Sequence, residues 1–176
     1  LPGAETRLDA LDFGIPQSIG EFAVTAFPTS HDAPGSCGFR LDAAGGAVGV
    51  LTDTGYVTDE AADILEGVDL AVLEANHDIE TLRSGPYPYY LKQRILGAQG
   101  HLSNEDAARF AAVLAQSGTS EIILAHLSRE NNTPAMAQTA VERALSAAGV
   151  SPLLSVAPRD CLGPAHTVSR RSVCRR

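Results

Sequence analysis

The sequence lacks any long hydrophobic run and is poor in cysteine. Its longest apolar stretches, such as residues 110–115 and 122–125, are far shorter than the ~18 residues that a membrane span needs, so we expect no membrane-spanning segment. The three cysteines are widely spaced and form no C-x-x-C pair, which favours neither a disulfide framework nor a structural zinc knuckle. With no secretory signal pattern at the start, this cysteine usage favours a reducing, cytoplasmic location.

Basic residues are also scarce. The chain has 13 Lys and Arg against 21 Asp and Glu, for a net charge of -8, and four of the arginines lie in residues 170–176, where there is no acid. The rest of the chain is therefore more acidic than the net charge suggests. Such a surface repels phosphate backbones, which excludes DNA binding through a broad basic face. A polyanion would need bound metal ions or a local basic patch, for which Arg83, Lys92, Arg94 and Arg129 are candidates.

Methionine occurs once, at Met136, so residue 1 is not an initiator methionine. We interpret the chain as processed, trimmed or part of a longer reading frame. Its 176 residues, 44% hydrophobic and 19% charged, are typical of one globular domain.

Strand and helix patterns alternate in the second half of the chain, which predicts an α/β fold. The expected strands are residues 21–27, 37–41, 47–52, 69–74, 121–126 and 153–157, and the expected helices are 58–65, 88–96, 103–115 and 134–148. Residues 160–176 are expected to form a basic, poorly ordered tail.

Polar residues that bind metals or protons follow several of these strands. His31, Asp53 and His126 lie directly after predicted strands, Glu74 ends another, and His101 precedes a helix. Taken singly, an aspartate before Thr-Gly is typical of a turn, and a loop histidine is more often structural than catalytic. Because imidazole and carboxylate are the ligands that zinc, manganese and iron prefer, their joint occurrence at strand ends predicts a metal site.

Five ordered segments resemble successive motifs of the metallo-β-lactamase-fold hydrolases, most of all the WalJ (YycJ)-like branch. They are FPTSHDA at 27–33, LTDTG at 51–55, LEANHD at 73–78, GHLSN at 100–104 and LAHLSRENN at 124–132. The resemblance runs from about residue 20 to residue 159. It implies an αββα sandwich, of which this chain would hold the second sheet and its helices, with residues 1–159 as the C-terminal part of a single domain.

The resemblance also implies roles for four residues. His31 would be a metal ligand, Asp53 would bridge two divalent metal ions, zinc or manganese, and His126 would bind the second ion. His101 matches a position that assists departure of the leaving group in related nucleases. The alternative for His101, a helix-start residue that bonds a backbone carbonyl, stays open.

The H-x-H-x-D-H motif that supplies most metal ligands in this family is absent, and no two histidines are closer than His77 and His101. The resemblance therefore implies the C-terminal portion of a longer hydrolase with an incomplete site. Its implied function is metal-dependent, exonuclease-like phosphodiester hydrolysis of nucleic acid. Alternatives are an ester, thioester or lactam hydrolase with the same centre, and a catalytically incompetent truncated chain. Strands left without cover would favour self-association.

Overall fold

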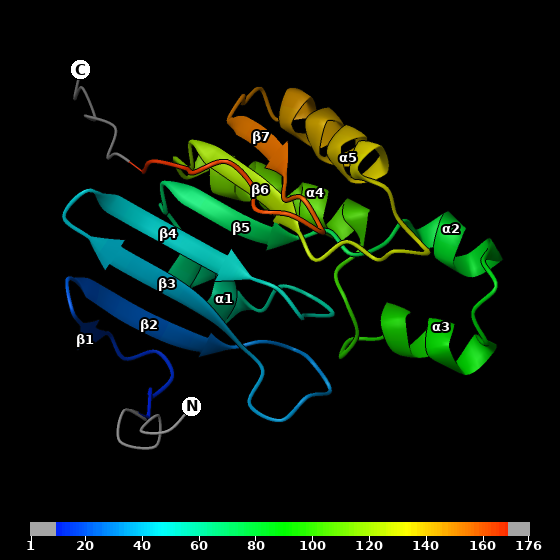
Figure 1. Cartoon of the computed structure of the whole chain (residues 1–176), viewed down its shortest axis with the longest axis horizontal. Coiled ribbons are helices and arrows are strands. Elements are labelled where there is room, and N and C mark those ends of the chain that lie inside the picture. Colours follow the sequence, from blue (N-terminus) through cyan, green and yellow to red (C-terminus); the bar gives the residue numbers. More distant parts are fainter. Residues whose placement is uncertain (1–9, 169–176) are drawn as a thin grey trace.

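The protein folds around one seven-stranded mixed sheet, seen in a computed structural model that describes residues 10–168 (Figure 1). The strands lie in chain order across the sheet. They are β1 (Gln17–Ile19), β2 (Phe22–Pro28), β3 (Cys37–Ala43), β4 (Gly46–Leu51), β5 (Leu70–Glu74), β6 (Glu121–Ala125) and β7 (Leu153–Val156). Strands β1 to β4 pair antiparallel, and β4 to β7 pair parallel.

Three helices cover one face of the sheet and form the core with it. The helices of the described chain are α1 (Asp59–Leu65), α2 (Ile79–Ser84), α3 (Tyr89–Leu96), α4 (Asn104–Gln116) and α5 (Pro134–Ala147). Apolar residues of α1, α4 and α5 share one buried cluster with alternate residues of the strands. Helices α2 and α3 lie beyond the strand ends instead (Figure 1). None of the helices in residues 10–168 is both long and apolar enough to cross a membrane.

The expected α/β class is confirmed, and each expected strand and helix is present within a few residues of its expected bounds. The helix starts follow from their capping residues, because the side chains of Thr58, Ser103 and Thr133 each accept a hydrogen bond from a backbone amide three residues on. Strand β1 and helix α2 were not expected from the sequence, because β1 is only three residues long and the six residues of α2 are too few for a helical period to be recognised.

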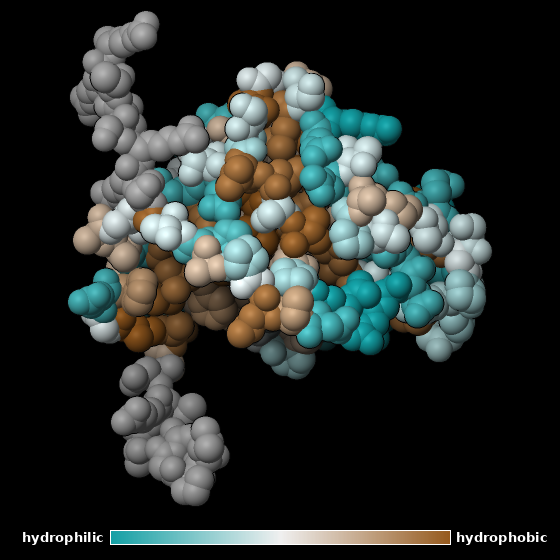
Figure 2. All heavy atoms as spheres, turned by 45° about the horizontal axis from the view of Figure 1, so that its top comes forward, coloured by the Kyte–Doolittle hydropathy of each residue, from teal (hydrophilic) through white to brown (hydrophobic). Residues whose placement is uncertain are grey.

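The opposite face of the sheet has no helix of the described chain on it. The last described segment, residues 157–168, returns over this face, where His166 Nδ1 lies 2.6 Å from Glu121 Oε1 on β6 (Figure 1). This segment includes residues 160–168 of the expected tail, whereas residues 169–176 lie outside the described part. At the β1–β2 edge several large apolar side chains are about half exposed. These side chains are Phe13, Ile15, Ile19 and Phe22. Figure 2 shows hydrophobic residues at its lower left and, over a larger area, in its centre.

Candidate functional site

Four strands of the sheet end at one edge, which is formed by their carboxyl ends and not by an outer strand. Because β3 runs antiparallel between β2 and β4, strands β2, β4, β5 and β6 all point the same way. His31 follows β2, Asp53 follows β4, Glu74 ends β5 and His126 follows β6. His101 reaches the same edge from the loop between α3 and α4. The fold thus gathers five side chains of the types that can bind metals or carry protons from distant parts of the chain.

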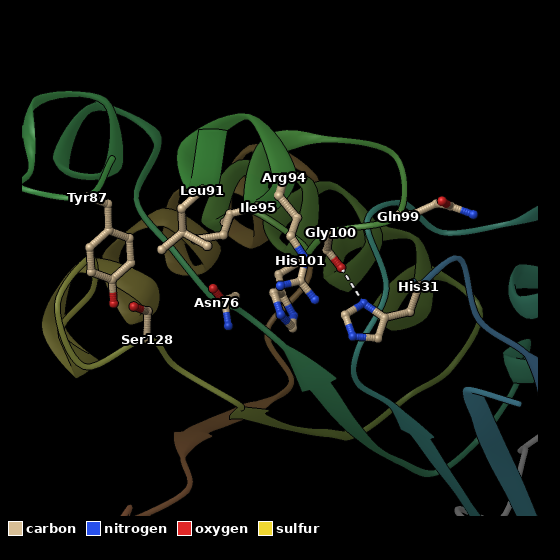
Figure 3. A pocket seen from close by; sticks show the side chains of 10 residues that line it. All are labelled: His31, Asn76, Tyr87, Leu91, Arg94, Ile95, Gln99, Gly100, His101 and Ser128. Atoms are coloured by element: carbon tan, nitrogen blue, oxygen red, sulfur yellow. Dashed lines mark hydrogen bonds between the residues drawn. The ribbon is translucent and has the colours of Figure 1, made fainter. Parts of the chain in front are cut away.

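A pocket of about 290 Å³ opens beside this edge (Figure 3). His31 and His101 lie at one end of it, and Tyr87 lies at the other. The lining residues are His31, Asn76, Tyr87, Leu91, Arg94, Ile95, Gln99, Gly100, His101 and Ser128. A small molecule in this pocket would therefore lie directly against two of the imidazoles.

Glu74 is the buried centre of the site. Its Oε1 accepts hydrogen bonds from His101 Nδ1 at 2.7 Å and His126 Nδ1 at 2.8 Å, and its Oε2 accepts one from the Thr54 amide at 3.0 Å. Burial alone would raise the pKa of Glu74, but these hydrogen bonds outweigh it and hold the pKa below its ordinary value. The hydrogen bond between Glu74 and His126 raises the pKa of His126. Glu74 is therefore a fixed negative charge that orients two imidazoles.

The three imidazoles are held in one common way. His31 Nδ1 lies 2.9 Å from the Gly100 carbonyl oxygen, just as His101 and His126 point Nδ1 at Glu74. A carbonyl or carboxylate oxygen only accepts hydrogen bonds, so we assign the proton of each neutral ring to Nδ1. Each Nε2 then carries a lone pair. The rings are close together, with centroids 4.9 Å apart for His31 and His101 and 5.1 Å apart for His101 and His126.

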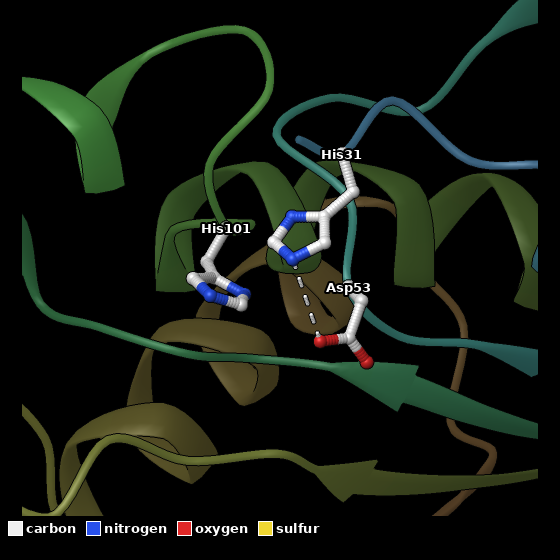
Figure 4. A group of neighbouring side chains, drawn as sticks. All are labelled: His31, Asp53 and His101. Carbon is white, nitrogen blue, oxygen red and sulfur yellow. Dashed lines mark ion pairs between the residues drawn. The ribbon is translucent and has the colours of Figure 1, made fainter. Parts of the chain in front are cut away.

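Asp53 lies between two of these nitrogens. Its Oδ1 is 3.9 Å from His31 Nε2 and 3.6 Å from His126 Nε2 (Figure 4 shows the first pair). Asp53 and His126 both have left-handed backbones, with φ of 56° and 58°. Such a conformation costs a non-glycine residue of order 1–3 kcal/mol and is concentrated at functional sites. In this chain the left-handed conformation occurs at Asp53 and His126, whose side chains meet at the carboxyl ends of the strands.

These residues fit a divalent metal ion. Imidazole nitrogen and carboxylate oxygen are the donors that zinc and manganese take. One ligand atom from each of His31, Asp53 and His101 lies within 4.8 Å of the others, and the same holds for Glu74, His101 and His126. Metal-binding histidines almost always donate the second ring N–H to a carboxylate or carbonyl, which is how all three rings are held here.

The structure brings together all four residues singled out from the sequence, His31, Asp53, His101 and His126. It adds Glu74, which the sequence placed among the strand-end residues without a role of its own. The signal was present, because this carboxylate directly follows the wholly apolar Leu70–Leu73 and so lies at the end of a buried strand.

Asp32 and Arg94 form a second pair that the sequence did not reveal. Arg94 Nε lies 2.5 Å from Asp32 Oδ2, and its Nη2 lies 3.1 Å from Oδ1. This hydrogen-bonded pair lowers the pKa of Asp32. The two residues are 62 positions apart, and no local pattern predicts such a contact.

Comparison with known proteins shows the family to which the chain belongs. The family model for the Beta-lactamase superfamily domain matches residues 2–127. The chain is 42% identical over 137 residues to exodeoxyribonuclease WalJ of Streptococcus pneumoniae serotype 2, covering 78% of this chain and 51% of that protein. It is 38% identical over 133 residues to exodeoxyribonuclease YycJ of Bacillus anthracis, covering 76% and 50%. The chain thus spans about half the length of the curated relatives it matches.

Solved structures share the fold at low sequence identity. A diphosphatase from the PhnP family matches with a TM-score of 0.53 and 13% identity, over 88% of this chain and 48% of that one. Zn²⁺-bound PqqB from Methylobacterium extorquens matches with a TM-score of 0.51 and 17% identity, over 84% and 48%. Together with the family match, these likenesses show that the chain belongs to the beta-lactamase superfamily, has the metallo-β-lactamase fold and is similar to the WalJ and YycJ proteins.

Proposed function

We propose that this chain carries part of the active site of a metal-dependent hydrolase that cleaves phosphodiester bonds in nucleic acid. The observation that carries the proposal is the set of three imidazoles anchored through Nδ1, two of which, His31 and His126, direct Nε2 at the Asp53 carboxylate. The choice of nucleic acid is supported by the relatives, which are named exodeoxyribonucleases.

His31, Asp53 and His126 would hold two divalent metal ions, zinc or manganese, with Asp53 shared between them. Asp53 suits this role because one of its oxygens already faces both imidazoles. Bound divalent ions would supply Lewis acidity and a water molecule acidified for attack. They would also bring positive charge to an acidic chain, where an approaching phosphate is otherwise repelled.

His101 has a different task in this proposal. In this proposal the ring acts in its doubly protonated form, in which Nδ1 donates to Glu74 and a second proton sits on Nε2, and the ring lines the pocket end that His31 shares. As the bond between phosphorus and the leaving oxygen breaks, that proton passes from Nε2 to the oxygen. The buried carboxylate of Glu74 holds Nδ1 and so fixes the orientation of the ring for this transfer.

The proposed roles, metal binding for Asp53 and proton transfer for His101, are tested by comparing Asp53→Ala with His101→Ala in the complete encoded protein. Asp53→Ala should lose metal and all turnover. His101→Ala should keep its metal and lose roughly 10²- to 10⁴-fold in rate, the usual worth of general acid-base assistance. A p-nitrophenyl phosphodiester should recover most of that loss, because its leaving group needs no proton. The measurements are metal content and hydrolysis rates on both substrates.

Loss of metal from His101→Ala to the same degree as from Asp53→Ala would make His101 a ligand and end this assignment. Hydrolysis of an ester, thioester or lactam by the unsubstituted protein, with no cleavage of DNA, would replace the phosphodiester proposal by the alternative chemistry.

A further inference from the structure

The stretch between Glu80 and Glu105 differs from the rest of this acidic chain. It contains no Asp or Glu, although the whole chain has 21, and it holds Arg83, Lys92 and Arg94. Three of the four tyrosines also lie in it, at positions 87, 89 and 90. In space this stretch forms most of α2, all of α3 and the loop to His101, beyond the ends of the strands (Figure 1).

One side of this stretch lines the pocket beside the catalytic cluster. Leu91 and Ile95, one turn apart on α3, form an apolar wall, and Tyr87 closes the end farthest from His31 (Figure 3). Asn76 and Ser128 provide polar groups on the side facing that wall. The pocket is thus aromatic and apolar at one end and lined by imidazoles at the other.

From this arrangement we infer that the pocket is a subsite for one unpaired nucleobase, with Tyr87 stacking on it and the adjoining phosphodiester lying at the His101 end. The inference rests on the proposed function, which places the reacting phosphate there. An aromatic ring with apolar neighbours suits a base of any sequence, because every base has a face on which to stack. A volume of about 290 Å³ is at the small end for ligand sites and suits one base rather than a base pair.

The occupant is single-stranded DNA, because stacking on Tyr87 needs an unpaired base and the relatives are named exodeoxyribonucleases. A paired base is stacked on both sides inside a duplex, so its face can meet Tyr87 only after it leaves the stack. Charge contributes less than stacking, because Arg94 is paired with Asp32 and Arg83 is paired with Glu80. Lys92 directs Nζ at the carbonyl oxygens of Arg83 and Gly85, both at 2.7 Å. Because the cations of this stretch are already engaged by other groups of the described chain, salt should weaken binding in the pocket only modestly.

The test measures binding of a short fluorescent oligodeoxynucleotide to the full chain by anisotropy, in low salt with a chelator present so that no hydrolysis occurs. Tyr87→Ala should weaken binding at least about 5-fold, the lower end for loss of one stacked base. Tyr87→Phe should keep the affinity, since it keeps the ring. Tyr56→Ala is the matched control, because this half-exposed tyrosine lines a different pocket, beside Phe110 and Val113. An oligonucleotide with an abasic residue at its end should bind the unsubstituted chain as weakly as the intact one binds Tyr87→Ala.

Three results would overturn the inference: equal affinity for the intact and abasic strands, equal loss in Tyr87→Ala and Tyr87→Phe, or tighter binding of a blunt duplex. Circular dichroism shows whether each variant folds. If Tyr87→Ala does not fold, photocrosslinking of a DNA strand that carries 5-iodouracil tests the inference on the unsubstituted chain. We expect an adduct at Tyr87. Adducts that form only outside the pocket would be the contrary result. The chelator removes hydrolysis from the binding measurement. The base subsite can therefore fail this test while the proposed hydrolysis holds, and the subsite can pass it while the proposed hydrolysis fails.

Discussion

At the scale of single residues, Glu74 is the side chain on which the site depends most, because three donors converge on its two oxygens. In Glu74→Gln the amide group has only one acceptor oxygen, and its NH₂ would face either an imidazole N–H or the Thr54 amide. An unsatisfied buried donor costs about 1–3 kcal/mol. We expect the variant to lose that much stability in urea unfolding and to bind manganese more weakly, since two imidazoles lose their anchor.

The matched control is Glu80→Gln on the surface of α2. Its partner is Arg83, and the Glu80 side chain is 82% exposed, so the same chemical change there should alter stability by less than about 0.5 kcal/mol. Equal effects of the two substitutions would show that the hydrogen bonds of Glu74 contribute nothing beyond an ordinary surface charge.

His77 gives the folded chain a sensitivity to acid. It is 1% exposed, and among the described residues neither of its ring nitrogens has a hydrogen-bond partner. Burial disfavours the charged ring and lowers the pKa of His77 to about 4. As the pH falls below the ordinary value near 6.5, the unfolded chain takes up a proton that the folded chain refuses until about pH 4, so the folded state loses stability across this window.

The loss attributable to His77 should be about 2 kcal/mol between pH 7 and pH 5. His77→Leu has no ring to protonate, and urea unfolding of this variant should show a pH dependence smaller by that amount. If both proteins lose the same stability between the two pH values, His77 is not the group responsible.

At the scale of elements, the loop that carries His101 is held by a close backbone contact. A Cβ on Gly55 would overlap the backbone carbonyl of Ala98, and Ser30 Oγ donates a hydrogen bond to that same carbonyl oxygen at 2.7 Å. Gly55→Ala must therefore push the residue 97–100 loop away from the strand ends. We expect a loss of about 1–3 kcal/mol in stability and a weaker metal site, because the His31 partner Gly100 moves with the loop.

Gly118→Ala is the comparison for this effect of space, since nothing lies within 4 Å of a Cβ there, although its φ of +116° carries its own backbone strain. Both substitutions should destabilise the chain, but only Gly55→Ala should weaken manganese binding. Unchanged metal binding in Gly55→Ala would show that the loop position does not control the site.

The elements themselves were largely predictable from the sequence, because each depends on local signals. Thr58, Ser103 and Pro134 mark helix starts, and apolar runs such as Leu70–Leu73 mark strands. The strand-end positions of His31, Asp53 and His126 were readable for the same reason. Contacts between residues far apart in the sequence could not be predicted. Examples are the pair of Arg94 with Asp32 and the anchoring of two imidazoles on one buried carboxylate.

At the scale of the whole molecule, the uneven cover of the sheet has consequences for association. Helices pack on one face, whereas the β1–β2 edge presents Phe13, Ile15, Ile19 and Phe22 with about half of each exposed. An edge strand with apolar neighbours is a template for pairing with another chain unless a charge blocks it. We therefore propose that copies of this chain associate through the β1–β2 edge.

Sedimentation velocity over a range of concentrations tests this proposal. The unsubstituted chain should sediment faster as its concentration rises, and Phe22→Lys should remain monomeric because a buried lysine at the contact would lose its hydration without a partner. Val113→Lys introduces the same charge on α4, where the native valine is 54% exposed, and should leave association unchanged. Association through this edge predicts an effect confined to Phe22→Lys. The proposal is therefore wrong if the unsubstituted chain stays monomeric at every concentration. It is also wrong if both substitutions abolish association.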